Sequence, residues 1–124
     1  MCFEDEDEQY AEKLLDYFVD ATAIVPEIWP LEVVNALLTA TRRDRLLKAE
    51  ANHFFHLLSS LPVDVIVGSS ALERYLSVLE LACEYGLSSY DATYLALAME
   101  RAVPLATLDQ KLMNAASGAG VALF

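Results

Sequence analysis

The stretch GLSSYDATYLALAMERA, residues 86–102, followed by PLATLD at 104–109, decides the fold that we predict. Ser88 or Ser89 can cap a helix that carries Asp91 in its first turn, because a serine hydroxyl accepts a bond from a backbone N–H group there. The proline that follows stops this helix and begins a short strand. The aspartate that ends the second stretch then opens a final helix. Two helices separated by a strand are predicted, each with an acidic residue at its start.

Hydrophobic periodicity predicts further helices and short strands upstream of this stretch. Apolar residues recur at helical spacing in three segments, and two short apolar runs rich in β-branched residues lie between them. We accordingly predict helices over 5–19, from Pro30 to the cluster that begins at Arg42, and over 47–58, with strands over 21–25 and 63–67.

A helix is also predicted just before Gly86, with Ser69 or Ser70 as its cap. Gly86 closes this helix, because glycine readily adopts the left-handed conformation of a helix end. The final VALF, residues 121–124, predicts a last strand. Helices that alternate with short apolar strands predict one α/β domain over residues 1–124 with a largely parallel sheet. The apolar side of the helix before Gly86 is predicted to include Leu72, Leu76, Leu79 and Ala82.

Composition supports a folded chain and limits its function. The 124 residues are 56% hydrophobic and 22% charged, which is enough apolar material for one core. The longest apolar runs fall short of the roughly 18 residues that a membrane span needs, and the acidic N-terminus is unlike a signal, so we expect a cytoplasmic protein. A net charge of -11 excludes unspecific coating of nucleic acid by a basic surface. Cys2 and Cys83 form no metal or disulfide pattern, and Cys83 is expected in the core.

Three acidic residues stand where an α/β domain places functional groups. Asp109 directly follows the strand PLAT, at the edge where open sheets bind ligands, whereas Asp91 and Glu32 lie in the first turns of helices. Either they only cap helices or offset helix dipoles, or they converge to hold Mg²⁺ or Mn²⁺ through carboxylate oxygens. Such an ion would serve phosphodiester hydrolysis by activating water and neutralising charge on the phosphate. Position alone leaves both readings open.

Three motifs together resemble those of the PIN-domain ribonuclease family. PLEVVNALL (30–38) is similar to the helix with the family's second acid, and GLSSYDATYLALA (86–98) to the helix with the third. PLATLDQKL (104–112) is similar to the strand and turn with the fourth. The motifs occur in family order, and the similarity extends from about Phe3 to Phe124.

The resemblance implies a fold, a metal site and an activity. The fold would be a three-layer α/β/α sandwich with a short parallel sheet. Carried over by position, Glu32, Asp91 and Asp109 become catalytic acids that bind Mg²⁺ or Mn²⁺, with Thr107 and Asn35 as supporting polar groups. The activity would be endonucleolytic hydrolysis of RNA phosphodiesters. The chain most resembles VapC-like toxins of bacterial toxin–antitoxin pairs, which implies a homodimer and a cognate antitoxin.

The chain departs from the family at its beginning. Family members begin with an apolar strand that ends in an aspartate, and this sequence begins at the tract that follows it, CFEDE at 2–6. The resemblance therefore predicts that the central first strand and the first catalytic aspartate are missing from the chain. Either the true start codon lies upstream, or the product is shortened and inactive or completes its sheet with another chain. The alternative function is a non-catalytic PIN-like module that acts through dimerisation or antitoxin binding.

A basic cluster and two histidines complete the candidate residues. The cluster holds half of the eight Lys and Arg residues within seven positions, and it either contacts RNA phosphates or offsets the dipole at a helix end. His53 and His56 lie three apart on a predicted helix but lack acidic or cysteine partners, so we expect partly exposed helix residues. The basic cluster consists of Arg42, Arg43, Arg45 and Lys48.

Overall fold

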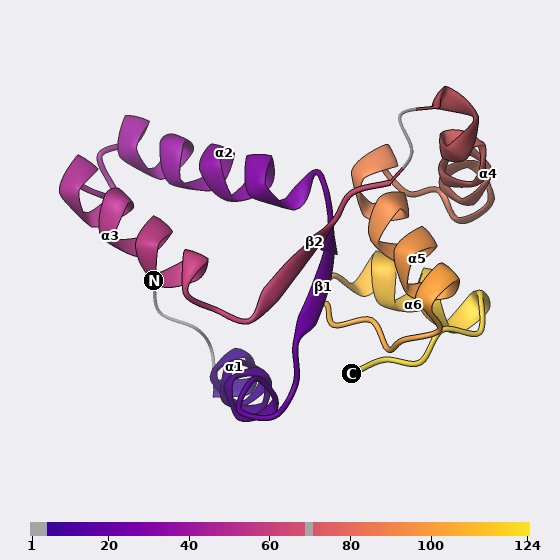
Figure 1. The fold of residues 1–124 in the computed structure, drawn as a ribbon, viewed down its shortest axis with the longest axis horizontal. Coiled ribbons are helices and arrows are strands. Elements are labelled where there is room, and N and C mark those ends of the chain that lie inside the picture. Colours follow the sequence, from indigo (N-terminus) through magenta and orange to yellow (C-terminus); the bar gives the residue numbers. More distant parts are fainter. Residues whose placement is uncertain (1–4, 69–70) are drawn as a thin grey trace. The chain divides into compact units, whose positions relative to one another are not determined.

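The structure is a computed structural model that describes residues 5–68 and 71–124. It divides into two compact units, Met1–Ile66 and Val67–Phe124, called here the first and the second unit. Figure 1 shows that helices and short strands alternate along the chain. Each unit has its own packing.

The first unit contains a short parallel sheet of two strands. Strands β1 (Ala23–Pro26) and β2 (Val63–Ile66) pair along all four residues. Parallel strands need a long crossover connection, and here it consists of α2 (Trp29–Arg42) and α3 (Lys48–Ser59), which contact each other. Helix α1 (Asp5–Tyr17) precedes the sheet (Figure 1).

Local sequence explains where the helices of the crossover begin and end. Pro30 lies in the first turn of α2, where a missing backbone N–H and a fixed φ are tolerated. A turn follows α2, in which Asp44 adopts a left-handed φ of 55°. At the start of α3 the Glu50 side chain accepts a hydrogen bond of 3.0 Å from the backbone N–H of Leu47. The predicted helix positions are therefore confirmed to within a few residues.

The first unit buries few side chains. Val25 and Pro26 of β1 are buried, as expected for a buried strand, but neither α2 nor α3 contains a buried residue. Both helices expose large apolar side chains, and those of α2 follow helical spacing and share one face. These exposed side chains are Leu31, Val34 and Leu38 on α2, and Phe54, Phe55 and Leu57 on α3.

Helices make up most of the second unit. A 3₁₀ helix, η1 (Leu72–Tyr75), leads directly into α4 (Leu76–Tyr85), and α5 (Ser89–Arg101) and α6 (Gln110–Gly118) follow. Helix α5 packs against both α4 and α6. Gly86 ends α4 with a left-handed φ of 62°, as predicted.

The prediction of which apolar side of α4 is buried is wrong for three of its four residues. Leu72, Leu76 and Leu79 are 83%, 58% and 60% exposed, whereas Val78 and Leu81 pack against the core. Helix α4 is apolar on two sides, so helical periodicity could not show which side is buried. Ala82 does face the core, as predicted, and its apolar neighbours there also include Tyr85.

Two further predictions concern the burial of Cys83 in α4 and the cap of the helix that precedes Gly86. Cys83 is exposed rather than in the core, because the side of α4 that carries it faces away from α5. Cys2 lies outside the described residues, as do Ser69 and Ser70, the expected caps of the helix. Ala71 precedes η1 instead and makes no side-chain capping bond.

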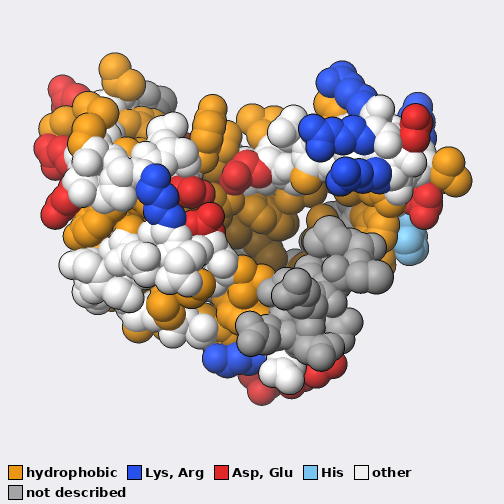
Figure 2. Space-filling model, turned by 180° about the vertical axis from the view of Figure 1, so that it is seen from behind, with side chains coloured by type: hydrophobic (Ala, Val, Ile, Leu, Met, Phe, Trp, Pro, Cys, Tyr) orange, Lys and Arg blue, Asp and Glu red, His pale blue; other side chains and the backbone are white. Residues whose placement is uncertain are grey.

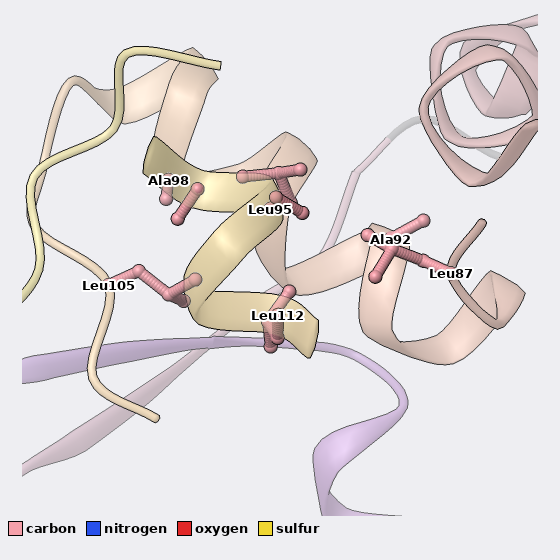
Figure 3. Close-up of a cluster of buried hydrophobic side chains, with 8 residues drawn as sticks. Leu87, Ala92, Leu95, Ala98, Leu105 and Leu112 are labelled. Carbon is pink, nitrogen blue, oxygen red and sulfur yellow. The ribbon is translucent and has the colours of Figure 1, made fainter. Parts of the chain in front are cut away.

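The core of the second unit gathers around α5 and α6. Each of these helices contributes three buried residues, and Leu95 is fully buried (Figure 3). Burial of a leucine side chain stabilises a fold by about 1.5–3 kcal/mol, so this cluster fixes how the two helices pack. The core residues are Leu87, Ala92, Leu95, Ala98, Leu105, Leu112, Ala115 and Ala116.

The strands predicted at PLAT and VALF are reduced to a single parallel bridge. Leu105 pairs with Leu123, and its N–H and C=O bond to the residues on either side of that partner at 2.8 and 3.0 Å. Pro104 lacks an N–H to extend the pairing. Two residues after Leu105, the Thr107 hydroxyl already turns the backbone toward α6. The prediction of two full strands is therefore wrong in extent.

The architecture is α/β, with six α-helices and a short parallel two-stranded sheet among the residues that the structure describes, as the sequence predicts. In residues 5–68 and 71–124, no helix combines the length and the apolar character needed to cross a bilayer. The single domain over residues 1–124 and the missing first strand stay predictions.

Candidate metal centre

Asp109 lies at the start of α6 and caps it. Its Oδ1 accepts a hydrogen bond of 2.9 Å from the backbone N–H of Leu112. The Thr107 Oγ1 accepts one of 3.1 Å from the backbone N–H of Asp109, so Thr107 fixes the backbone that carries the carboxylate. The capping role considered for Asp109 is confirmed. Because the side chain is exposed and only Oδ1 is used by the cap, Oδ2 is open to a cation or to solvent.

Asp91 lies in the first turn of α5 and is positioned by a different cap. The Ser88 Oγ accepts a hydrogen bond of 3.1 Å from the backbone N–H of Asp91, so Ser88 and not Ser89 is the cap. The Asp91 side chain is half-buried, and within the described part of the chain no side chain bonds to its carboxylate. Because this half-buried carboxylate has no side-chain partner among the described residues, its oxygens can accept a cation or a hydrogen-bond donor from outside.

The helices that carry these two acids are held together by the core. Ala92 follows Asp91 directly, and Leu112 lies one turn after Asp109, and both are buried in the same cluster. The side chain of Lys111 adds a second link. Its Cε and Nζ lie 3.8 and 3.9 Å from the position that a Cβ on Gly86 would occupy, in the turn before α5. The start of α6 is therefore beside the turn that leads into α5.

Lys111 is a residue that the sequence analysis missed. Its signal was a cation in the first turn of a helix, where the dipole disfavours positive charge, only two residues after a candidate metal ligand.

Glu32 lies in the other unit, on an exposed face of α2. It is in the first turn of that helix, and its backbone N–H donates to the Ile28 carbonyl at 3.1 Å. Asn35 follows three residues later, which places both side chains on the same face of α2. Both are exposed. The prediction that Asn35 supports Glu32 agrees with this spacing and stays a prediction.

The predicted metal centre would combine acids from both units. Across 5–68 and 71–124, no three His, Cys, Asp or Glu side chains gather as a metal site. His53 and His56 are exposed, as expected, and their rings contact the neighbouring Phe54 and Phe55. The three-acid centre stays a prediction.

The basic cluster is an exposed surface at the turn between α2 and α3. All four of its side chains are exposed, and Figure 2 shows Lys and Arg side chains gathered at that end of the first unit. Arg42 is in the last turn of α2, where a cation offsets the helix dipole. Arg43 is the C-cap of that helix, but Arg45 lies beyond it and Lys48 begins α3, so the dipole of α2 does not account for the whole cluster.

The helices and strands, with an acidic residue at the start of each of two helices, define the class of the protein as a small α/β domain. The PIN domain family matches residues 2–118, and the chain belongs to that family. A solved structure, PAE2754 from Pyrobaculum aerophilum, is similar at 27% identity and a TM-score of 0.63, over 86% of this chain and 75% of that chain. No curated protein matches significantly. The chain therefore has a nuclease-type fold, in a family whose members are generally metal-dependent hydrolases.

Proposed function

We propose that this protein is a cytoplasmic endoribonuclease that uses Mg²⁺ or Mn²⁺, and that it is the VapC-like toxin of a toxin–antitoxin pair. The observation that carries the proposal is the family match over residues 2–118 together with Asp91 and Asp109 at helix starts of one packed unit. Helix caps alone would explain Asp109, but they leave the half-buried Asp91 carboxylate without a bonding partner among the described residues.

The donor set is of the kind that a hard divalent cation prefers. Glu32, Asp91 and Asp109 would supply carboxylate oxygens, and Mg²⁺ or Mn²⁺ favours oxygen ligands. Thr107 would hold the Asp109 backbone, and Ser88 would hold that of Asp91, so that both carboxylates start from fixed positions. Mutual repulsion of the carboxylates would be offset by the cation.

The reaction that this arrangement supports is hydrolysis of an RNA phosphodiester. When bound, a divalent cation supplies charge neutralisation at the phosphate and lowers the pKa of water for attack. The residues of the chain would bind and orient that ion, and the basic cluster would contact RNA phosphates outside the centre. The partners proposed with this function are the RNA substrate, a second copy of the chain in a homodimer, and an antitoxin whose Arg or Lys reaches the acids.

A metal titration and a cleavage assay on the full chain test this function. We expect single-stranded RNA to be cleaved with Mg²⁺ or Mn²⁺ and not with a chelator present. Asp91→Asn and Asp109→Asn should each lower kcat at least about a hundredfold, because a ligand oxygen loses its charge. Asparagine is the chosen replacement because it still caps a helix, which preserves folding at Asp109.

The matched control is Asp64→Asn, the same change at an exposed aspartate of β2. It should leave cleavage and Mn²⁺ affinity unchanged. If the wild-type chain neither binds Mn²⁺ nor cleaves RNA, the non-catalytic PIN-like module becomes the better account. That alternative is favoured by the exposed apolar faces of α2 and α3, which suit a protein partner.

A second arm of the test concerns the first strand of the family. Translation of the codons upstream of Met1 should give an apolar strand that ends in an aspartate. A chain extended by that segment should bind Mn²⁺ more tightly than the 124-residue chain, because one further carboxylate would join the centre. Equal affinities would contradict the missing-ligand prediction and leave Glu32, Asp91 and Asp109 as the whole set.

A further inference from the structure

The second unit holds only three cations against six carboxylates in its sequence, and they lie in different places. The guanidinium of Arg74 is 4.6 Å from the centre of the Tyr75 ring. Arg101 lies in the last turn of α5, ten residues and so about 15 Å along the helix from Asp91. Lys111 alone lies in the first turn of an acid-bearing helix.

The side chain of Lys111 reaches from the start of α6 to the turn before α5. Lys111 follows Asp109 by two residues in α6, and its ammonium end lies 3.9 Å from the Cβ position at Gly86. Gly86 in turn comes two residues before Ser88, the cap that fixes the Asp91 backbone. One cation of the second unit therefore starts two residues after Asp109 and ends near the turn that leads to Asp91.

We propose that Lys111 binds a phosphate group of the RNA at the acidic centre, an inference that rests on the proposed nuclease function. Lys111 is exposed, and its side chain makes no hydrogen bond or ion pair with residues 5–68 and 71–124. Its three ammonium donors are therefore open to a ligand. An ammonium is a compact charge that binds phosphate oxygens without a fixed orientation, which suits a flexible backbone.

Among the described cations of the second unit, Lys111 is the one placed to offset the repulsion between RNA and the acidic residues. RNA carries one negative charge per phosphate, and Asp91 and Asp109 would repel the strand at the position where it must be held for cleavage. A cation beside the carboxylates offsets this repulsion at short range, where solvent and salt screen it least. The competing explanation is that Lys111 only offsets the negative end of the α4 dipole at Gly86.

The test compares Lys111→Gln and Lys111→Arg with Arg101→Gln in the full chain, on single-stranded RNA with Mg²⁺. Arg101→Gln is a matched control, because it removes one positive charge from the far end of α5. We expect Lys111→Gln to raise KM about tenfold, as loss of one charged contact does, and Lys111→Arg to restore it. The slope of log(kcat/KM) against log[salt] should become shallower by about 0.7, the value for one phosphate on a single strand. Arg101→Gln should match the wild type in both.

Two outcomes would overturn the inference, and a third separates it from the function on which it rests. A KM and a salt slope for Lys111→Gln equal to those of Arg101→Gln would exclude a phosphate contact. A lowered melting temperature with unchanged KM and slope would assign Lys111 to the α4 dipole instead. If the wild-type chain does not cleave or bind RNA at all, the proposed function fails and this inference fails with it, whereas cleavage with an unaltered slope refutes only the inference.

Discussion

The two units differ in how their helices are stabilised, although both are built from amphipathic helices and short parallel pairings. Helices α5 and α6 each bury three residues, whereas α2 and α3 bury none. The apolar side chains that would form a core in the first unit are present, but they are exposed on α2 and α3. Similar sequence patterns thus give a packed cluster in one unit and exposed apolar surfaces in the other.

This difference separates the candidate ligands into two kinds. Asp91 and Asp109 begin helices whose opposite sides are anchored in a core, so their backbones are held in place. Glu32 lies in the first turn of α2, a helix without buried residues. Its position is therefore not fixed by a core, and a protein partner on the apolar face of α2 would influence it. Formation of the proposed metal centre is therefore expected to depend on partner contacts more strongly at Glu32 than at the other two acids.

The largest effect is expected from removal of buried volume in the second unit. Leu95→Ala should lower the free energy of unfolding by about 2–5 kcal/mol, because Leu95 is fully buried and a cavity would remain. Urea denaturation of both proteins measures the loss. The matched truncation Phe54→Ala, at a side chain 44% exposed on α3, should cost less than about 1 kcal/mol. Equal losses at the two positions would remove the contrast between the units.

A medium effect is expected at the helix start that carries Asp91. Ser88→Ala should destabilise the protein by about 1 kcal/mol, since the Asp91 N–H loses its hydrogen-bond acceptor. Ser89→Ala should change stability by less than about 0.5 kcal/mol, because Ser89 lies inside the helix and does not cap it. Thermal unfolding monitored by circular dichroism compares the two. A larger loss at Ser89 would show that the cap is assigned to the wrong serine.

The smallest effect is expected at the two described non-glycine residues with left-handed backbone, one in each unit. Ala102 ends α5 with a φ of 52°, and Asp44 follows α2 with a φ of 55°. Ala102→Gly should raise the free energy of unfolding by up to about 1 kcal/mol, because alanine is strained there and glycine is not. Asp44→Gly should gain less, since aspartate tolerates this region better. A gain at Asp44 that exceeds the gain at Ala102 would contradict this ranking.

Much of the fold could be predicted because proline, glycine and capping residues mark several helix ends in the local sequence. Pro30 and Gly86 mark helix boundaries through backbone restrictions that act within a few residues, and the structure confirms both. The buried side of α4 could not be predicted, because two of its sides are apolar and only packing against α5 decides between them. The strand at PLAT was overestimated for a similar reason, since the number of bridges that Leu105 makes depends on a distant segment.

In the candidate site, too, local features could be predicted and tertiary ones could not. The caps at Asp109 and near Asp91 follow from residue type and position, and the structure shows both as hydrogen bonds. Convergence of the acids could not be predicted from spacing, because it depends on how separate segments pack. Family resemblance supplied the expectation that Glu32 joins them. The place of Lys111 in the first turn of α6 was visible in the sequence, but its approach to the turn at Gly86 depends on tertiary packing and could not be predicted.

The pairing of β1 with β2 has a consequence for how the protein folds. Ala23 pairs with Val63, 40 positions later in the chain, so this sheet forms only after the whole helical crossover has been brought back. The helices of the second unit meet through much shorter stretches of chain, and short loops close at a smaller loss of conformational entropy. We therefore expect the second unit to acquire structure first during refolding, with β-sheet formation in the first unit as the slower phase.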